Sequence, residues 1–354
     1  MSLAVVEYRT ASEWDGLVVG HPHGHLLQRW AWGELKSAFG WQPLRLAVVR
    51  AGQEQPVAAA QILVRRVMGL AVCYVPRGPL FSGDATIDLV LLRALRRAAL
   101  RRRAAFLRLE PNILEGASGA SRLHSDLQVA GFKVAPPLQP RMSMHLDLTP
   151  EPDRLFAGFS KGHRADVRRA ERNGVSVRVG ITPADLDAFY RIMEATTARA
   201  GFGIHSRDYY SEAWRLFGDD ARLLIASRED QGDIAAFLLF ANNQEAQYMY
   251  SGSTAEGLKS GENHLLQWHA IRWARERGCA RYDLWGIPED IGDLLHAPEE
   301  QRQELEAQAK AHPLYGAYRF KKGWGGDTVR YLPAYDQVYF LPAYWWWCRR
   351  GGAG

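Results

Sequence analysis

The order of strand-like and helix-like segments repeats along this 354-residue chain, and this repeat constrains the fold more than any single motif. The first half has strand-like runs, a long helix and a buried strand, in this order: 44–49, 56–66, 70–75, 88–103 and 104–112. The second half adds a leading helix to a similar order: 182–200, 222–227, 233–241, 245–251, 261–278 and 282–285. Such mixing of strands and helices is typical of α/β or α+β domains. We therefore predict two tandem domains at 1–140 and 141–330. Each is a mixed, mostly antiparallel sheet flanked by helices, and residues 331–354 pack back on the first.

Composition excludes several classes of protein. Cys73, Cys279 and Cys348 lie far apart without a CxxC pair, which predicts neither a disulfide framework nor a zinc site and favours a reducing compartment. The first residues lack the basic segment and long apolar core of a signal peptide, so none is expected. The sequence contains no run of about 18 apolar residues, so no membrane span is expected. The net charge of +5 suits a partner that carries phosphates, without requiring one.

Three histidines, His21, His23 and His25, alternate with other residues in the segment HPHGH. This spacing allows a metal site, but Pro22 and Gly24 interrupt it and no carboxylate or cysteine is adjacent. A polar loop is therefore the favoured interpretation, and we predict no metal.

The stretch 312–330, HPLYGAYRFKKGWGGDTVR, combines lysines, aromatic residues and glycines. On a strand, Arg319 and Lys321 would share one face, with Phe320 and Lys322 on the other. A lysine held among aromatic residues at a strand end can stabilise the negative charge that develops in acyl transfer. The alternative is a surface hairpin with solvated lysines.

Basic residues recur at helical spacing in the segment 161–172, which carries a net charge of +3. The members of this stripe are Lys161, Arg164, Arg168 and Arg172. The stripe is interpreted either as a solvated helix face or as a surface that binds RNA or another polyphosphate. The helix at 88–103 has a similar arginine-rich face, which we expect to be solvated.

Two further segments offer polar groups for a ligand. Arg207 lies beside two tyrosines in the loop 202–210, where a guanidinium can bind phosphate in a bidentate manner or remain solvated. In the segment 245–251, strand alternation predicts that Tyr248 and Tyr250 lie on one face. Residues 288–311 are acidic and rich in Gln, which indicates a surface insertion.

Several motifs together resemble the FemXAB peptidyltransferases, which move an amino acid from aminoacyl-tRNA to the stem peptide of a peptidoglycan precursor. The similar segments are LLQRWAWGELKSAFGW (26–41), SKGHRADVRRAERNGVSVRVG (160–180), YMYSGS (248–253) with the helix 261–278 and YDLWGI (282–287), and YGAYRFKKGWGG (315–326). The last segment resembles the family motif Tyr-x-Phe-Lys-x-Gly-Phe-Gly and is the most specific. The resemblance covers most of the chain and implies two tandem GNAT-like domains. The long coiled-coil arm of some members has no counterpart here.

The resemblance also implies roles for individual positions. Phe320 and Lys321 match the Phe-Lys of the motif, and Lys321 would stabilise charge on the reacting ester. Glu110 falls where the family carries an acidic residue near the reacting amine. The implied substrate-binding residues are Trp32, Lys36, Arg207, Tyr248 and Tyr250, with Lys36 and Arg207 on the precursor's diphosphate and Tyr250, together with Tyr248, on the acceptor peptide.

The resemblance implies direct aminoacyl transfer without a cofactor. No Ser-His-Asp or Cys-His pattern is evident, so attack by the stem-peptide amine in a ternary complex is favoured over a covalent enzyme intermediate. The proton of the amine would pass to Glu110 or to a carboxylate of the substrate. The implied partners are aminoacyl-tRNA and either UDP-MurNAc-pentapeptide or lipid II. The amino acid, the accepting position and the oligomeric state stay open.

Three other functions remain open. One is an acyltransferase that uses acyl-CoA on a polysaccharide or a small acceptor, although the segment LKSGEN (258–263) lacks the GNAT pyrophosphate signature. The others are an aminoacyl-tRNA:protein transferase and a non-catalytic RNA-binding module. The aromatic and basic tail, PAYWWWCRR (342–350), either packs on the first domain or contacts the inner face of a membrane. The expected location is therefore cytoplasmic, with peripheral membrane contact left open.

Overall fold

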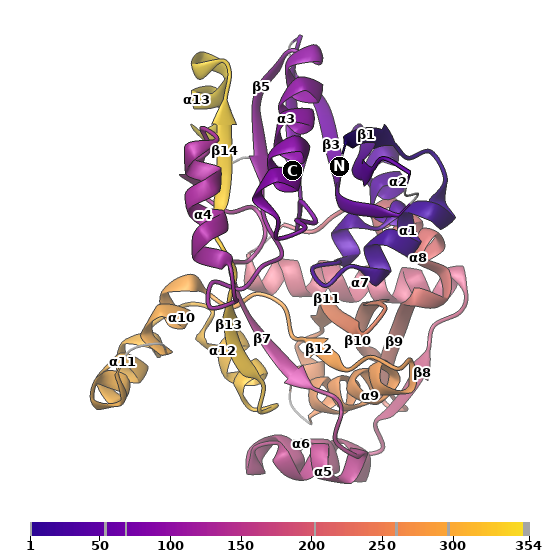
Figure 1. Cartoon of the computed structure of the whole chain (residues 1–354). Helices are drawn as coiled ribbons and strands as arrows, with labels where there is room; N and C mark the ends of the chain where they lie inside the picture. Colours follow the sequence, from indigo (N-terminus) through magenta and orange to yellow (C-terminus); the bar gives the residue numbers. More distant parts are fainter. Residues whose placement is uncertain are drawn as a thin grey trace. The chain divides into compact units, whose positions relative to one another are not determined.

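The computed structural model describes residues 2–52, 55–67, 69–201, 203–258, 261–295 and 298–349. Lys259 and Ser260 of the segment LKSGEN, Phe202 of the loop before Arg207, and Arg350 of the tail lie outside these residues. The chain divides into two compact units (Figure 1). Unit 1 comprises Met1–Arg141 with Arg330–Gly354, and unit 2 comprises Met142–Val329.

Among its described residues, unit 1 has one sheet of seven strands in the order β1-β2-β3-β4-β5-β14-β6. The strands are β1 (Leu3–Glu7), β2 (Gln42–Arg50), β3 (Pro56–Val67), β4 (Leu70–Val75), β5 (Ala104–Leu109), β6 (Lys133–Ala135) and β14 (Ala334–Val338). The helices are α1 (Ala11–Gly20), η1 (Leu26–Gln28), α2 (Trp30–Ala38), α3 (Ala85–Arg101), α4 (Ala120–Val129) and α13 (Leu341–Arg349). Strands β4 and β5 are parallel and α3 connects them, whereas the remaining neighbours pair antiparallel.

Helices cover both faces of the sheet of unit 1. On one face, Leu91 and Leu95 of α3 and Leu123 and Leu127 of α4 are buried in a core with the strands. Their spacing of four residues gives each helix one apolar face. On the opposite face, α1 packs through Trp14 and Val18, and α13 packs against Val72 and Phe106.

The described part of unit 2 also has a seven-stranded sheet, with the order β13-β7-β12-β11-β10-β9-β8. Its strands are β7 (Met142–Asp147), β8 (Ser176–Val179), β9 (Ala221–Arg228), β10 (Gly232–Asn242), β11 (Glu245–Ser253), β12 (Arg281–Asp283) and β13 (Asp327–Arg330). Its first helices are α5 (Pro152–Gly158), α6 (Lys161–Arg172), α7 (Pro183–Ala200), α8 (Arg207–Phe217) and η2 (Gly218–Asp220). The rest are η3 (Glu256–Leu258), α9 (Glu262–Glu276), α10 (Glu289–Leu295), η4 (Glu299–Gln301), α11 (Arg302–Ala309) and α12 (Tyr315–Lys322).

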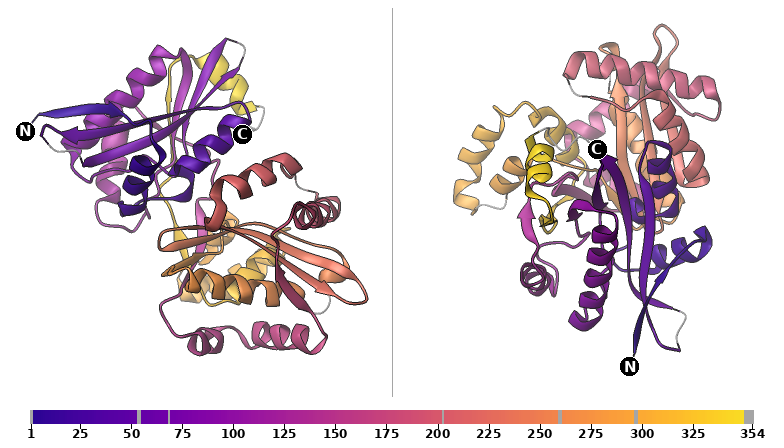
Figure 2. Two further views of the ribbon diagram at one scale, coloured as in Figure 1. Left: turned by 90° about the vertical axis from the view of Figure 1, so that its right-hand side faces the viewer. Right: turned by 90° about the horizontal axis from the view of Figure 1, so that it is seen from above.

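Unit 2 repeats the connection seen in unit 1. Strands β9, β10 and β11 form an antiparallel meander, and α9 leads to β12, which runs parallel to β11. Helices α7 and α8 lie on one face of this sheet, and α5, α6 and α9 lie on the other (Figure 2). The predicted class, two mixed and mostly antiparallel sheets flanked by helices, is therefore confirmed.

Three sequence expectations are wrong in detail. The segment around Lys321 is the helix α12 rather than a strand, because Tyr315 and Tyr318, three residues apart, both pack toward the core of unit 2. Arg319 and Lys321 consequently do not share a face in the way a strand would require. The segment 288–311 is not only surface, since Ile291 and Ala309 are buried in the core of unit 2.

The third difference concerns β11. Tyr250 pairs with Leu238, whereas Gln247 pairs with Phe240, so three steps along β11 match two steps along β10. A bulge of this kind reverses the alternation of side chains along the bulged strand. Tyr248 and Tyr250 therefore lie on opposite faces of the sheet, not on one face as alternation predicts.

Candidate active site

Lys321, near the end of α12, is held by backbone carbonyl groups of the loop that follows β12. Its Nζ donates hydrogen bonds to Gly286 O at 2.6 Å and to Trp285 O at 3.2 Å. Trp285 adopts a positive φ of 63°, which turns the loop sharply and costs strain in a residue other than glycine. An ammonium group has three donors, so this geometry leaves one for a further acceptor.

The surroundings of Lys321 weaken its hold on its proton. Burial lowers the pKa of Lys321 to about 8, and the nearby carboxylate of Asp283 opposes this change by favouring the charged form. At neutral pH the group is therefore mostly an ammonium, but it sits close to the range where it becomes neutral.

Asp283 lies at the end of β12 and is fully buried. Its Oδ1 accepts hydrogen bonds from the Ser143 hydroxyl and, at 2.8 Å, from the backbone N–H of Trp285. Its Oδ2 lies 3.8 Å from Nε2 of His145. The backbone of His145, in β7, pairs with that of Asp283, in β12. Asp283 thus fixes the strained loop whose carbonyl groups hold Lys321. The sequence singled out YDLWGI as similar to the family, but it did not assign a role to Asp283, Trp285, Ser143 or His145.

Phe320 precedes Lys321 and is held by His163 of α6. His163 Nε2 lies 2.7 Å from the carbonyl oxygen of Phe320, and its Nδ1 lies 3.1 Å from Oγ of Ser160. The end of α12 packs tightly here, because a Cβ atom on Gly323 would lie 1.9 Å from Cε1 of His163. The backbone N–H of Ser160 also donates to Gly323 O at 2.9 Å. These contacts fix the position of the Phe-Lys pair.

A second histidine, His264 of α9, packs where His163 of α6 contacts the end of α12. The ring centroids of His163 and His264 are 4.6 Å apart, and Phe320 lies 5.0 Å from His264. Burial lowers the pKa of both histidines, that of His264 to about 4, and the proximity of His163 adds to the effect on His264. Both rings are therefore neutral at pH 7 and pack against the ring of Phe320, while His264 Nε2 lies 3.5 Å from Oδ2 of Asp166.

Arg207 and Tyr250 belong to the face of the unit 2 sheet that α7 and α8 cover. Arg207 is the first residue of α8 and forms an ion pair with Asp187 of α7. The ring of Tyr250 contacts Tyr210 and His205, with centroids 5.0 Å and 6.1 Å apart. Tyr250 therefore packs among aromatic rings, and the guanidinium of Arg207 is engaged by a carboxylate.

Tyr248 lies on the opposite face, where its ring packs against Phe237 at a centroid distance of 4.8 Å. Burial raises its pKa well above the usual value of a tyrosine. A contact of Tyr248 with the acceptor peptide stays a prediction.

Trp32 and Lys36 lie together on α2 of unit 1. Nζ of Lys36 is 5.1 Å from the ring centroid of Trp32, in a cation–π arrangement. Burial and, to a smaller extent, the charge of Arg65 lower the pKa of Lys36 to about 8. A negatively charged ligand would relieve this repulsion, so the pair is chemically suited to bind an anion.

Glu110 follows β5 and its carboxylate is engaged inside unit 1. It accepts hydrogen bonds from the Tyr74 hydroxyl and from the backbone N–H groups of Leu138 and Gln139. Burial raises the pKa of Glu110, although the hydrogen bond from Tyr74 partly opposes this change. These contacts give Glu110 a clear structural role, and its predicted role in proton transfer is left as a proposal.

The basic stripe lies along α6 as the sequence spacing indicates. Lys161, Arg168 and Arg172 are exposed, and the guanidinium of Arg168 lies 5.5 Å from the ring centroid of Phe156. Arg164 is half-buried and donates to Ala157 O at 2.9 Å.

The histidines at 21–25 serve the local turn. Nδ1 of His25 accepts from the N–H of Leu27, and Nδ1 of His21 accepts from the N–H of His23. In the part of the chain that the structure describes, no group of three or more His, Cys, Asp or Glu residues is arranged to hold a metal ion. Across the same residues, no helix has both the length and the hydrophobicity needed to cross a membrane.

A model of the FemAB family matches residues 10–229 and 222–337. The chain belongs to the FemAB family. Among curated proteins, a lipid II:glycine glycyltransferase of Staphylococcus aureus (strain USA300) is 25% identical over 415 aligned positions, which include 95% of this chain and 93% of that protein. The version of the same enzyme from strain Mu50 is 24% identical with the same coverage. These matches confirm the expected family and the expected class of enzyme, an aminoacyltransferase.

Solved structures support the fold independently. The crystal structure of FemX has a TM-score of 0.82 at 22% identity, and the similarity covers 98% of this chain and 99% of that one. A tandem GNAT protein from the clavulanic acid biosynthesis pathway has a TM-score of 0.56 at 14% identity, with 95% and 98% covered. The prediction of two tandem GNAT-like domains is therefore confirmed.

Proposed function

We propose that this enzyme transfers an aminoacyl group from an aminoacyl-tRNA to an amine on the stem peptide of a peptidoglycan precursor. The acceptor is lipid II or UDP-MurNAc-pentapeptide, and the product carries the start of an interpeptide bridge. The relatives named lipid II:glycine glycyltransferase support the acceptor class. The tRNA donor rests on the resemblance of the motifs and on the basic surface of α6.

The observation that carries this proposal is the position of Lys321. Two backbone carbonyl groups orient its ammonium group, and one donor remains for a substrate oxygen. Its partial burial strengthens an interaction with developing charge, because nearby water does not screen it fully. A lysine on a flexible surface helix would have neither property.

In the proposed reaction, the neutral amine of the stem peptide attacks the ester carbonyl carbon of the aminoacyl-tRNA. A C–N bond forms, and the carbonyl oxygen becomes an oxyanion that accepts a hydrogen bond from Lys321 Nζ. The C–O bond to the terminal ribose then breaks, and the ribose oxygen leaves. The ribose oxygen takes up a proton in place of the one that the amine loses, so the net products are an amide and a free ribose hydroxyl.

The first acceptor of that proton is a carboxylate. Glu110 accepts hydrogen bonds from three donors within unit 1, which makes release of its oxygens costly. We therefore favour a carboxylate of the substrate itself, with Glu110 as the alternative. A Glu110→Gln variant that folds normally and keeps its rate would exclude the alternative.

Binding residues complete the proposal. Lys36 beside Trp32 would bind the diphosphate of the precursor, and Arg207 would take part by exchanging its contact with Asp187. Tyr250, with Tyr248 behind it in the sheet, would support the acceptor peptide. Lys161, Arg164, Arg168 and Arg172 would contact the phosphates of the tRNA, and this binding would weaken as salt rises. A lipid-linked acceptor would bring the enzyme to the inner face of the membrane as a peripheral protein.

The test is a transfer assay with a mixed pool of radiolabelled aminoacyl-tRNAs and either UDP-MurNAc-pentapeptide or lipid II in detergent. Lys321→Met should reduce kcat by about a hundred- to a thousand-fold, as expected for the loss of one oxyanion donor. Lys322→Met is the matched control, because Lys322 is exposed and pairs with Glu306 at 2.7 Å. Label in one precursor that disappears only in the Lys321 variant supports the proposal. Label transferred from acyl-CoA instead, or to a protein N-terminus, overturns it.

A further inference from the structure

Large apolar side chains are exposed around the start of α13. Phe340, Leu341, Trp345 and Trp346 are 47%, 70%, 59% and 37% exposed. They are four of the thirteen large hydrophobic residues that are exposed in the described part of the chain, and they lie within seven positions. Apolar groups gathered in this way on a surface mark interaction sites more often than isolated ones do.

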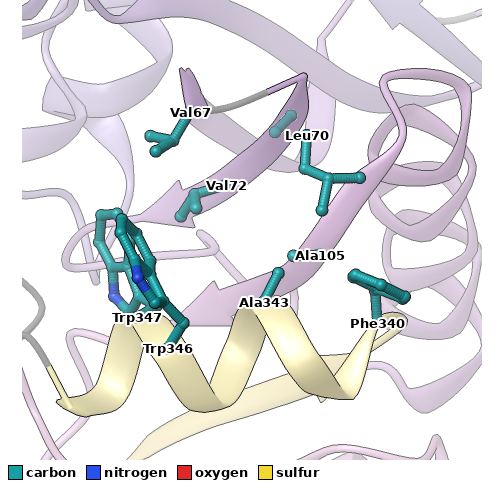
Figure 3. Close-up of a pocket in the computed structure, with 9 residues that line it drawn as sticks. Val67, Leu70, Val72, Ala105, Phe340, Ala343, Trp346 and Trp347 are labelled. Atoms are coloured by element: carbon teal, nitrogen blue, oxygen red, sulfur yellow. The ribbon is translucent and has the colours of Figure 1, made fainter.

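The same helix covers an apolar pocket of about 230 Å³ within unit 1. Figure 3 shows its walls, which come from α13 and from strands β3, β4 and β5. The lining includes Val67, Leu70, Val72, Ala105, Ala343 and Trp346. All of its lining residues are apolar, so the pocket suits a hydrocarbon group and offers no charged partner to a polar ligand.

The chain segments that contribute the pocket lining carry positive charge and no negative charge. The segments 65–75, 101–105 and 340–349 contain two, three and one arginines respectively, and no Asp or Glu. Arg66, Arg101 and Arg103 are exposed, and Arg103 O accepts a hydrogen bond at 3.2 Å from Ala71 N in the pocket wall. The guanidinium of Arg349 lies 3.4 Å from the ring centroid of Trp345.

We propose that this surface binds a membrane that contains anionic lipids, with α13 in the headgroup layer and one lipid hydrocarbon chain in the pocket. Tryptophan and arginine both favour the boundary between headgroups and hydrocarbon. The arginines match anionic headgroups, and the segments 65–75, 101–105 and 340–349 contain no acidic residue that would repel them. Membrane binding is measured directly, so the proposal can fail or hold independently of the transfer reaction.

The first test measures flotation of the full-length protein with vesicles of phosphatidylcholine, alone or mixed with phosphatidylglycerol. The wild type should bind the anionic vesicles at least about tenfold more tightly, because the segments that line the pocket carry arginines and no acidic residue. Trp345→Ser with Trp346→Ser should lose most of this binding. Leu314→Ser is the control, since Leu314 is also exposed, at 55%, but belongs to unit 2.

A charge test separates headgroup attraction from simple hydrophobic adsorption. Arg101→Glu with Arg103→Glu should weaken binding to the anionic vesicles and leave binding to phosphatidylcholine unchanged. The proposal is overturned if the wild type ignores both kinds of vesicle, or if the tryptophan variant floats as well as the wild type. It is also overturned if these substitutions abolish self-association of the protein while vesicle binding persists, because the patch is then an interface between copies.

The pocket has a separate test with cis-parinaric acid, a fluorescent probe that has one hydrocarbon chain and an anionic carboxylate. The wild type should bind it saturably at one site. Ala343→Phe, which adds a ring to the wall on α13, should reduce this affinity about tenfold by filling the space. Ala343→Ser keeps the space and serves as control, and Val67→Phe fills it from β3 should the first variant misfold. Equal affinity in the filled and control variants contradicts a chain in the pocket. Transfer to water-soluble UDP-MurNAc-pentapeptide should be unchanged in all these variants.

Discussion

In unit 1 the strand that follows the connecting helix leads into Glu110, whereas the equivalent strand of unit 2 ends at Asp283. Both carboxylates are buried next to a parallel pair of strands. Glu110 receives its hydrogen bonds from Tyr74 and from the backbone of 138–139, all within a closed set of partners. Asp283 instead fixes a loop whose carbonyl groups point to Lys321. The same topology therefore places a carboxylate with a structural role in unit 1. In unit 2 it places one that supports the loop around Lys321, and a few neighbouring side chains make the difference.

The comparison predicts that buried charge in unit 1 matters chiefly for stability. Arg108 and Asp336 form a buried bidentate pair, with N–O distances of 2.8 Å and 2.6 Å. Arg108→Met should destabilise the protein by about 3–5 kcal/mol, because it leaves the Asp336 carboxylate buried without its partner. Urea denaturation measures this loss. Arg215→Met, which removes an exposed pair with Glu212, should cost less than about 1 kcal/mol. Similar losses in the two variants would contradict the assignment.

In unit 2, activity should depend on the position of Lys321 more than on the overall stability of the unit. Gly323→Ala forces a Cβ atom into the ring of His163, so either this ring or the end of α12 must shift, and the contact that fixes Phe320 and Lys321 is disturbed. We expect the free energy of unfolding to fall by about 1–3 kcal/mol. The fall in kcat, expressed as an activation free energy, should be larger than this. Denaturation and steady-state transfer kinetics give the two numbers.

Gly316→Ala is the matched control on the same helix, because a Cβ atom there meets nothing within 4 Å. Alanine favours a helix over glycine by roughly 0.5–1 kcal/mol, so this variant should be slightly more stable and fully active. If both glycine variants lose the same activity, contact with His163 does not position Lys321.

A smaller effect is expected for the lysine of unit 1. Lys36→Ala should raise the KM for the precursor about tenfold and leave kcat nearly unchanged, because a binding contact contributes equally to substrate and transition state. Lys36→Arg should retain part of the affinity. A fall in kcat at constant KM would instead place Lys36 in the chemical step.

The mildest perturbation is a change of pH. Lys321 must be an ammonium to stabilise an oxyanion, and its pKa is about 8. The rate for saturated enzyme should therefore be halved near pH 8 and should fall further above it, as the ammonium loses its proton. In Lys321→Arg the guanidinium stays charged, so this alkaline decline should disappear even if the maximal rate is lower. An unchanged decline would assign it to another group.

Sequence pattern predicted the helices and meanders well where local rules decide them. Thr182 and Asp185 form a capping box at the start of α7, and the long helices α3 and α9 have regular apolar spacing. The motif around Lys321 is evident in the sequence, but its helix is not, because consecutive basic residues and glycines obscure the spacing of Tyr315 and Tyr318. With eight residues, α12 is too short to be stable alone and depends on the core that Tyr318 enters.

The rest of the site depends on pairing that is distant in sequence. Ser143 and His145 approach Asp283 only because β7 pairs with β12, across about 140 residues of chain. The bulge in β11 also follows from the match with β10 and leaves no clear mark in the sequence QYMYS. Periodicity within one segment cannot contain this information, so it predicts one face for two tyrosines that lie on opposite faces.

The place of β14 has a consequence for how the protein is made. This strand lies between β5 and β6, yet it is synthesised after all of unit 2. Until β14 emerges from the ribosome, β5 and β6 have exposed edges and Arg108 lacks its partner Asp336. The sheet of unit 1 is therefore incomplete at a time when the whole of unit 2 is already available to fold. A nascent chain that stops before Ala334 would therefore be recognisable to quality control by its first domain, although the missing residues come from its end.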